Sequence, residues 1–326
     1  MTTAPVLVLL DHTDAGALRP AVLELLSLGR GIGPVHAVWV GGALAPSAEA
    51  LATLGEAGVE QVHTVAVGDH HPRLTPVVAQ ALAAVAAAVG PGTVLLTSSF
   101  ENKEVAGRLG VLTGAGVVVD ATGLEQVEGR LVVTKGVFAG TWTTRCTVRT
   151  PMAVLAFKPH AAEVVPAAAA TTPAVVAHDV VVTGSAARVV LVERTERAPS
   201  DRPDLGAAQV VVVGGRGTDG DFSAVEDLAD ALGGAVGATR VATDEGWIDQ
   251  DAQIGQTGVT VSPRLYIGAG VSGAVHHRGG MQSAGTIVAV NSDPEAPIFE
   301  IADLGIVGDL FTVLPQATAE IRRLRG

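Results

Sequence analysis

Residues 265–280 read LYIGAGVSGAVHHRGG, which is the residue order of a strand, a glycine turn and a helix. The apolar run 265–267 is followed directly by glycines, and the helix after them is kept short by Gly279 and Gly280. Strand–turn–helix units of this kind build α/β folds with a mainly parallel sheet.

The glycines of this stretch also suggest one function. Gly268, Gly270 and Gly273 spell G-x-G-x-x-G, and Asp293 follows about twenty residues later, where dinucleotide-binding folds carry a ribose-binding carboxylate. An NAD-dependent oxidoreductase that uses the GAGVSG turn is therefore one hypothesis. However, the strand predicted at 210–213 comes earlier and has its own glycine-rich turn, whereas the dinucleotide pattern belongs to the first strand of its domain.

The alternation of strands and helices continues along the whole chain. Short Val- and Leu-rich runs predict strands at residues 6–10, 35–40, 62–67, 94–97, 117–119 and 153–157, with an edge strand around 180–182. Further strands are predicted at residues 210–213, 265–267, 286–290 and 298–301. Apolar helical faces lie between the strands, and helices are expected to stop at Gly29, Gly90 and Gly233.

The chain is expected to form two α/β domains. Its 326 residues exceed the usual size of one domain. The charged, turn-rich segment 193–208 has the composition of a linker, so we place the boundary near Leu205. Residues 1–204 then form a Rossmann-like parallel-sheet domain that includes edge strands and the linker, and residues 205–326 form a flavodoxin- or Rossmann-like domain.

The composition excludes several classes of function. The formal net charge is -12 and no basic face is visible, so nucleic-acid binding is not expected. Cys146 is the one cysteine, which rules out an internal disulfide and a cysteine-based zinc site. The apolar run 6–10 is too short for a signal peptide or a membrane span. The sequence therefore predicts a cytoplasmic, prokaryotic protein that is not itself embedded in a membrane.

Several catalytic motifs are nearly present but fail. GVSGA has Ala274 where a nucleophile elbow needs glycine, and GGRGTDG lacks the Lys-Ser/Thr pair of a P-loop. The histidines in the pairs 70–71 and 276–277 are adjacent rather than spaced along one helix face, so no metal site is predicted.

Polar residues gather instead at the glycine turns of the second domain. Arg216 follows the strand predicted at 210–213, Arg240 follows GAT, and Ser272 begins the short helix. Open α/β sheets bind ligands at the carboxyl ends of their strands, where these residues are expected. Arginines, hydroxyls and backbone N–H groups suit a pyrophosphate and an electron-rich ring.

Several segments between residues 210 and 315 match those of one known family, in the same order along the chain. They read GGRG, GATR, DEGW, QIGQTG, SPRLYIGAGVSGAVHH and TIVAVNSDPEAPIFEIADLGIVGDLFTVLPQ. In this order they resemble the α subunit of the electron transfer flavoproteins, and AVNSDPEAPIFEIADLGIVGDL is the most specific segment. The N-terminal half is similar only loosely, through its α/β pattern and the RPDL linker.

The resemblance implies an electron carrier in which the C-terminal domain holds most of one FAD. A β subunit would complete the heterodimer, with the subunit interface in residues 1–204, and would carry AMP, although a relative with a second flavin in that subunit stays open. The expected donors are flavin dehydrogenases such as the acyl-CoA dehydrogenases of fatty acid β-oxidation, and the expected acceptor is a membrane quinone oxidoreductase. No catalytic residue is expected, because electron carriage needs no general base or nucleophile of the protein.

Carried across position by position, the resemblance implies cofactor-binding roles for Arg216, Thr239, Arg240, Gln253, Gly255, Gln256, Thr257, Gly270, Ser272, Gly273, His277, Asn291, Asp309 and Leu310. Arg216 and Ser272 match residues near the phosphates and ribose, and the 253–257 loop matches the surroundings of the ribityl chain. Asn291 and Asp309 match the adenosine end.

Three of these residues are expected to tune the flavin. Arg240 matches an arginine over the isoalloxazine ring, His277 a histidine at its O2, and Thr257 a residue at its N5 edge. A positive charge and a hydrogen-bond donor there would stabilise an anionic semiquinone, so that electrons pass one at a time.

The sequence also departs from the family pattern at four positions. Thr239 replaces a serine before the stacking arginine but keeps the hydroxyl. Gly268 stands where alanine is common. His276 and Arg278 replace residues that are more often neutral, so the electrostatics near the flavin are expected to differ.

Overall fold

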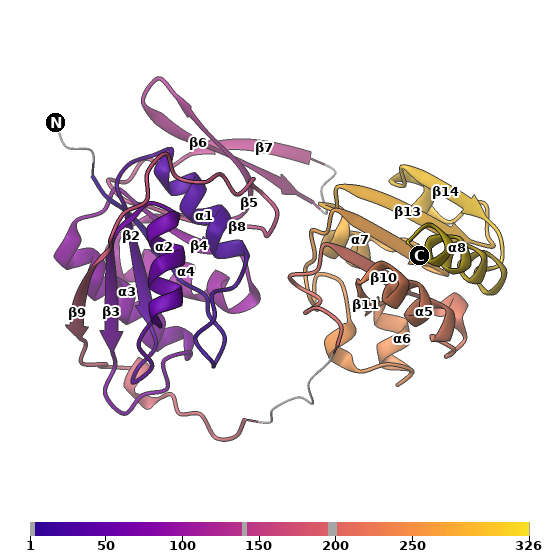
Figure 1. The fold of residues 1–326 in the computed structure, drawn as a ribbon, viewed down its shortest axis with the longest axis horizontal. Coiled ribbons are helices and arrows are strands. Elements are labelled where there is room, and N and C mark those ends of the chain that lie inside the picture. The colour runs from indigo at the N-terminus through magenta and orange to yellow at the C-terminus, as the bar shows by residue number, and fades with distance from the viewer. Residues whose placement is uncertain (1–3, 139–141, 195–200, 326) are drawn as a thin grey trace. The chain divides into compact units, whose positions relative to one another are not determined.

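The computed structural model describes residues 4–138, 142–194 and 201–325 (Figure 1). The chain divides into two compact units, the first built mainly from Met1–Lys135 and Thr144–Glu196 and the second mainly from Arg197–Gly326. Both units are α/β and both contain a parallel sheet, so the predicted fold class is confirmed.

The N-terminal unit is built on one sheet with the strand order β7-β6-β5-β8-β4-β1-β2-β3-β9. Its strands are β1 (Val6–Leu9), β2 (Val35–Val40), β3 (Val59–Ala66), β4 (Thr93–Thr97), β5 (Gly116–Val127), β6 (Arg130–Val137), β7 (Trp142–Thr147), β8 (Ala153–Phe157) and β9 (Ala174–Asp179). From β5 to β9 in this order every neighbouring pair is parallel, whereas β5 and β6 form an antiparallel pair.

Helices cover both faces of the parallel part of this sheet. They are α1 (Ala21–Arg30), α2 (Ala48–Glu56), α3 (Thr75–Val89) and α4 (Phe100–Thr113), with a short 3-10 turn η1 (Ala186–Arg188). Val6 and Val8 pack with α1 and α2, while the alternating Leu7 and Leu9 pack with α3 and α4. A strand that is buried on both faces has an unbroken run of apolar residues, which is why β1 could be predicted from the sequence.

The C-terminal unit has a five-stranded parallel sheet with the order β11-β10-β12-β13-β14. Its strands are β10 (Val210–Gly214), β11 (Ala235–Ala238), β12 (Leu265–Ala269), β13 (Thr286–Asn291) and β14 (Leu304–Val307). Its helices are α5 (Ser223–Leu232), α6 (Arg240–Asp244), α7 (Val275–Met281) and α8 (Leu310–Arg325), with the 3-10 turns η2 (Arg216–Thr218), η3 (Gln250–Ala252) and η4 (Pro297–Glu300). In order along the chain the strands are arranged 2-1-3-4-5, the flavodoxin-like order.

Two layers cover this second sheet. Leu228 of α5 and Leu314 of α8 share one core cluster with Val212 and Ile267 of the sheet. The opposite face packs α7, through Met281, in a second cluster. α3 and α5 end at Gly90 and Gly233, as predicted. Gly90 has φ 66° and Gly233 has φ 68°, both in the left-handed region that glycine adopts easily.

Three sequence-based predictions need correction. The strand predicted at 298–301 is the 3-10 turn η4, and the true strand β14 begins at Leu304. The edge strand predicted around 180–182 lies earlier, at β9. Gly29 does not stop α1, which continues through Arg30. The antiparallel strands β6 and β7, and the short β11, were not predicted.

Candidate functional site

The order of strands in the C-terminal unit creates a topological switch point between β10 and β12. The chain leaves β10 toward β11 on one side and leaves β12 toward β13 on the other, so the loops after β10 and β12 diverge at the carboxyl edge of the sheet. Open α/β sheets bind ligands in the crevice formed there. In a nicotinamide dinucleotide fold the G-x-G-x-x-G turn follows the first strand of its domain. Here the first strand is β10 and the pattern follows β12, so it does not have the position of a dinucleotide-binding turn.

Two glycine loops touch at this switch point. The N–H of Gly217 donates to the carbonyl of Gly270 at 3.1 Å, and the N–H of Gly215 donates to the carbonyl of Ala269 at 3.0 Å. Gly270 has φ +62°, and a Cβ added there would lie 2.8 Å from Cα of Gly217. A side chain at residue 270 would therefore be strained and would push the two loops apart.

The loop after β12 is held from its other side by the neighbouring connections. Ile298 donates its N–H to the carbonyl of Ser272 at 3.0 Å, and Asn291 Nδ2 donates to the carbonyl of Val271 at 2.9 Å. A Cβ on Gly273 would lie 2.4 Å from the backbone nitrogen of Ile298. The glycines were expected to make room for a cofactor, and the Cβ positions of Gly270 and Gly273 in fact face the chain's own backbone.

This loop presents backbone donors. Within the residues that the structure describes, no hydrogen bond is found for the N–H groups of Ser272 and Gly273, and Ser272 is exposed. Unpaired main-chain donors at a glycine turn fit the oxygens of a phosphate.

Two arginines flank the same edge. Arg216 in η2 is exposed, and in the described part of the chain no ion pair or hydrogen bond of its guanidinium is found. Arg240 begins α6 after β11, is 69 % exposed, and pairs through Nε with Asp244 at 3.1 Å. Both cations therefore remain available to an anionic or electron-rich ligand.

The loop 253–257 is organised around a buried glutamine. Gln253 Oε1 accepts from Gln250 Nε2 at 2.8 Å and lies 3.1 Å from the hydroxyl of Thr243. Gln253 Nε2 donates to Thr257 Oγ1 at 3.0 Å. Since this hydroxyl oxygen already accepts a hydrogen bond, its own proton is free to be donated outward, and Thr257 is exposed. Gln253 supports the edge, and Thr257 presents the donor.

His277 is buried within the C-terminal unit. Its Nδ1 lies 3.0 Å from the carbonyl of Ile254, and its Nε2 lies 2.7 Å from the hydroxyl of Tyr266. Burial lowers its pKa to about 4, an effect that the bond to Ile254 partly opposes. Both ring nitrogens thus have protein partners, and the expected hydrogen bond from His277 to a flavin stays a prediction.

The remaining expected residues serve local structure in this unit. Asn291 Oδ1 accepts from the N–H of Asp293 at 3.0 Å. Asp309 Oδ1 accepts from the N–H of Phe311 at 3.1 Å at the start of α8. Leu310 is buried, and its Cδ2 would lie 2.9 Å from a Cβ on Gly270. Their predicted place at the adenosine end of a cofactor is not tested by these contacts.

The positions around the histidine pair are engaged as well. Gln256 donates its N–H to the carbonyl of His276 at 3.0 Å, and Gln256 Oε1 lies 3.1 Å from His276 Nδ1. Arg278 Nε donates to the carbonyl of Gly273 at 2.6 Å, and Arg278 Nη1 pairs with Glu300 at 2.9 Å. The extra cation at residue 278 is therefore partly neutralised. Gly255 lies against α7, since a Cβ on it would be 3.0 Å from the carbonyl oxygen of His276, and Thr239 is buried at the start of α6.

Taken together, the carboxyl edge of this sheet offers unpaired backbone donors, two exposed guanidinium groups and an outward hydroxyl, which suit a ligand with phosphate groups. Sequence reasoning missed Tyr266 and Thr243, which hold the expected residues in place. Tyr266 could have been found as the single tyrosine of the chain, set inside an apolar strand.

Two further searches cover the described residues. No group of three or more His, Cys, Asp or Glu side chains is placed among them to hold a metal ion. None of their helices combines the length and the apolar character needed to span a membrane.

Comparison with known proteins identifies the family over most of the chain. Residues 6–183 match the electron transfer flavoprotein domain, and residues 204–282 match the electron transfer flavoprotein FAD-binding domain. The chain is 44% identical over 330 residues to the electron transfer flavoprotein subunit alpha of Mycobacterium leprae (strain TN), covering 99% of this chain and 100% of that protein. The subunit alpha of Mycobacterium tuberculosis (strain ATCC 25618 / H37Rv) is 42% identical over 337 residues, with 99% and 100% covered. That of Bacillus subtilis (strain 168) is 33% identical over 326 residues, with 97% of each chain covered. With two family matches in order and relatives alike along their full lengths, the chain belongs to the electron transfer flavoproteins as an α subunit with an FAD-binding domain.

Proposed function

We propose that this chain holds one FAD per αβ heterodimer and carries electrons singly from flavin dehydrogenases to a membrane quinone oxidoreductase. The observation that carries the proposal is the donor set at the β10/β12 switch point, which lies in the region matched by the FAD-binding domain. We take residues 205–326 as the FAD-binding domain, and the start of that match at residue 204 supports this boundary.

The residues at the carboxyl edge of the C-terminal sheet would bind different parts of FAD. Arg216 and the N–H groups of Ser272 and Gly273 would bind the pyrophosphate, since they are the cation and the unpaired donors of the glycine loops. Arg240 would lie over the ring system and Thr257 would donate its hydroxyl proton to the ring edge. FAD, when bound, supplies the redox chemistry, and the chain supplies binding, orientation and electrostatics.

The charge of Arg240 gives the site a preference between redox states. A guanidinium beside the ring favours a form that carries negative charge over the neutral oxidised form, as expected for a carrier that works through the anionic semiquinone. A charge-assisted contact contributes about 1.5 to 3 kcal/mol, which corresponds to about tenfold or more in the one-electron equilibrium.

The partner is proposed from the names of the relatives, which are called subunit alpha. We infer that a β subunit completes the protein and carries AMP. Acyl-CoA dehydrogenases of fatty acid β-oxidation are the proposed donors, and the cytoplasm of a prokaryote is the proposed location.

The test is co-expression with the β subunit encoded in the same genome, followed by extraction and quantitation of FAD and AMP. We expect one FAD and one AMP per heterodimer, and accumulation of the singly reduced flavin during stepwise titration with dithionite. A second flavin in place of AMP would change the proposed class of carrier. Recovery of a nicotinamide dinucleotide without flavin would favour the NAD-dependent oxidoreductase instead.

A further inference from the structure

Every carbonyl group of the loop 270–273, which follows β12, accepts a hydrogen bond from elsewhere in the C-terminal unit. Three of the donors, at 2.9 to 3.1 Å, are the backbone N–H groups of Gly217 and Ile298 and the side-chain amide of Asn291. The fourth is Nε of Arg278 on α7, which donates to the carbonyl of Gly273 at 2.6 Å. The loop thus turns its carbonyl oxygens toward the protein itself.

The N–H groups opposite these carbonyls have no such partners. In a trans peptide the C=O of one residue and the N–H of the next point in opposite directions. The held carbonyls therefore direct the N–H groups of residues 271–274 away from the groups that bind them, and within the described residues no hydrogen bond of these N–H groups is found. Val271 and Gly273 are buried, where an unpaired N–H is unfavourable until an acceptor binds it. Consecutive main-chain donors are thus left for an acceptor that the chain does not supply.

The peptide between Gly273 and Ala274 depends on a side chain for its orientation. Gly273 has φ +84°, in the region that glycine enters easily, so this peptide could rotate at little cost without its hydrogen bond. In the part of the chain that the structure describes, Arg278 is the one donor to the carbonyl of Gly273. The direction of the Ala274 N–H is therefore set by Arg278.

Arg278 is itself held in place from the turn η4. Its Nη1 pairs with Oε2 of Glu300 at 2.9 Å. Ile298 of the same turn donates its N–H to the carbonyl of Ser272, and a Cβ on Gly273 would lie 2.4 Å from the backbone nitrogen of Ile298. The turn η4 thus fixes two neighbouring carbonyls of the loop, one directly and one through Arg278.

The chemistry of these donors indicates what they bind. Successive main-chain N–H groups form concave sites for anions. A second loop that touches this one adds a cation, since Arg216 is exposed and directly precedes Gly217, whose N–H holds the carbonyl of Gly270. Of the parts of the proposed cofactor, the phosphates of FAD fit this combination.

We propose that Arg278 is a positioning residue of the FAD site: it holds the carbonyl of Gly273 so that the N–H of Ala274 stays free for a phosphate oxygen. This rests on the proposed function, because it takes the phosphates to be those of FAD. The pairing with Glu300 neutralises part of the charge of Arg278. The contribution of Arg278 is therefore the geometry of the loop and not an added positive charge.

The experiment compares Arg278→Leu with Arg325→Leu in the αβ heterodimer. Arg325 is a matched control because its Nη1 also donates to a main-chain carbonyl at 2.6 Å, that of Ala231 in the last turn of α5 before β11. The heterodimer is freed of flavin and titrated with FAD and with riboflavin, which has the ring but no phosphate. Arg278→Leu should weaken FAD binding about tenfold, the loss of one hydrogen bond to a charged group, and should leave riboflavin binding unchanged. Arg325→Leu should change neither.

Glu300→Ala separates geometry from charge. Removal of this carboxylate makes the surroundings of the loop more positive, so an effect of charge alone predicts tighter binding of FAD. Positioning predicts the opposite sign, because Arg278 loses the partner that holds it. We expect FAD binding about two- to threefold weaker, the size that follows from loss of an ion pair with an exposed member.

A further readout needs no flavin. Inorganic pyrophosphate should shift the amide NMR signals of residues 271–274 in the flavin-free wild-type heterodimer. In Arg278→Leu the shift at Ala274 should be lost, while the shift at Ser272 should remain.

Four results would each overturn the proposal: wild-type affinity for FAD in Arg278→Leu, an equal loss of riboflavin binding, an equal loss of FAD binding in Arg325→Leu, or tighter binding in Glu300→Ala. A wild-type heterodimer that binds pyrophosphate at this loop but takes up no FAD would instead refute the proposed function. In that case the Arg278-dependent shift at Ala274 would still support its positioning role.

Discussion

Both units of the molecule contain a parallel sheet with a topological switch point, yet the two crevices are filled differently. In the N-terminal unit the switch point lies between β1 and β4, and in the C-terminal unit between β10 and β12. Beyond β1, Asp11 accepts the Thr97 hydroxyl, and Asn102 Nδ2 donates to it at 3.0 Å. Burial raises the pKa of Asp11 despite these bonds. The polar groups of this crevice are thus occupied by one another.

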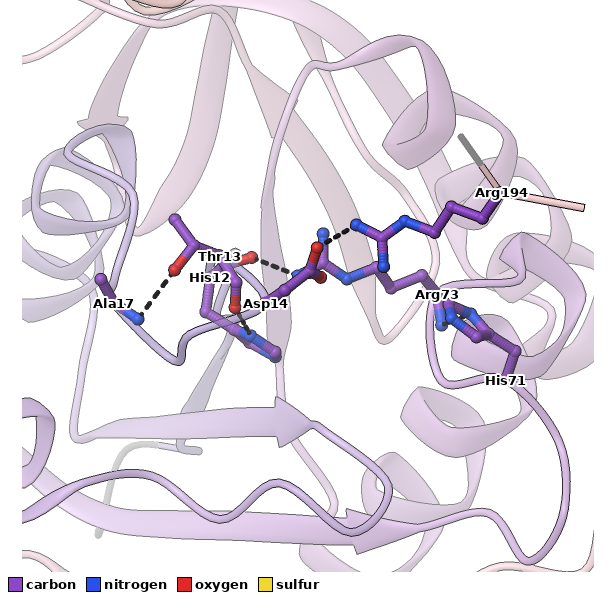
Figure 2. A network of polar contacts seen from close by, with 7 residues as sticks. All are labelled: His12, Thr13, Asp14, Ala17, His71, Arg73 and Arg194. Carbon is purple, nitrogen blue, oxygen red and sulfur yellow. Dashed lines mark hydrogen bonds and ion pairs between the residues drawn. The ribbon is translucent and has the colours of Figure 1, made fainter. Parts of the chain in front are cut away.

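Charged side chains of the N-terminal unit that follow β1 are also paired with other side chains of the chain. Asp14 lies between Arg73 and Arg194, and Figure 2 shows both guanidinium groups directed toward it. The Asp14–Arg73 distance is 2.7 Å, and the hydrogen bond from Arg194 contributes most to lowering the pKa of Asp14. In the C-terminal unit, by contrast, Arg216 is exposed and the N–H of Ser272 has no partner among the described residues.

Backbone N–H groups that follow β8 lie close to an acidic side chain of the N-terminal unit itself. The carboxyl group of Glu24 on α1 lies close to the backbone N–H groups of residues 160–162, and its Oε1 is 3.5 Å from Nδ1 of His160. A side chain of α1 thus occupies the backbone groups that follow β8. The topology alone therefore offers a crevice twice, and the side chains decide which one stays open to a cofactor.

The largest effect is expected from closing the open crevice with a methyl group. Gly270→Ala combines a left-handed φ with a Cβ that would lie 2.8 Å from Gly217. Strain and overpacking together should lower the free energy of unfolding by about 3 to 4 kcal/mol, and the heterodimer should lose most of its FAD. Urea unfolding and flavin content measure the two losses.

Gly233→Ala is the matched control for this change. Gly233 has nearly the same φ, +68°, but a Cβ there would meet nothing within 4 Å. It should lose about 1 kcal/mol of stability and keep its FAD. Equal losses in the two variants would mean that backbone strain, and not contact between the glycine loops, governs the site.

The second prediction concerns the filled crevice and its dependence on pH. Burial raises the pKa of Glu24 from 4.5 to about 7, and the bonds from Ala162, His160 and Ala161 oppose that rise. Because the folded state then holds the proton more tightly than the unfolded state, stability falls as pH rises from about 4.5 to about 7 and is level above that. At about 1.4 kcal/mol per pKa unit the loss is about 3 kcal/mol.

Glu24→Gln should remove this slope while leaving FAD content unchanged. The measurement is urea unfolding between pH 4.5 and 8, followed by the fluorescence of buried Trp39 with Trp142 and Trp247 replaced by phenylalanine. If Glu24→Gln keeps the wild-type slope, the dependence on pH does not come from the buried carboxyl group of Glu24.

The sequence predicted best those elements whose burial is uniform. The runs at 35–40 and 153–157 are buried at every residue, and β2 and β8 have the expected bounds. β14 was missed because Leu304 and Val307 are more than half exposed, whereas the apolar run 298–301 before it owes its burial to a 3-10 turn packed in the core. Apolar content alone does not separate a strand from such a turn.

The sequence named candidate residues for the site but did not predict their contacts. Arg216 and Ser272 follow strands that were predicted, whereas Arg240 follows β11, which was not, and the structure brings all three to one sheet edge. The pairing of Tyr266 with His277 depends on α7 folding back over β12, which residue types alone do not determine. The acid that fills the N-terminal donors, Glu24, was equally invisible, because it lies far along the chain from residues 160–162.

The third prediction tests whether the open edge acts through charge. Arg240→Ala should lower the potential of the first one-electron couple by about tenfold in the equilibrium, about 59 mV, since one guanidinium beside the ring is lost. Dithionite titration with reference dyes measures this shift. Arg264→Ala removes another exposed cation just before β12, at the opposite end of that strand, and should leave the potential unchanged. A shift of equal size in both variants would assign the effect to net charge rather than to position.

The smallest effect is expected from Asp244→Asn, which releases Arg240 from its partner. The pair is an exposed i,i+4 contact at 3.1 Å, with the two side chains 69% and 52% exposed. Such pairs contribute about 0.3 to 0.5 kcal/mol, so the potential should rise by roughly twofold or less in the equilibrium, and salt should diminish the rise further. The corresponding change at the closed edge, Asp14→Asn, leaves Arg73 and Arg194 without their shared carboxylate and should alter the stability of the N-terminal unit but not the potential. A tenfold rise in Asp244→Asn would contradict the comparison between the two units. It would mean that Asp244 holds Arg240 as firmly as Asp14 holds Arg73 and Arg194.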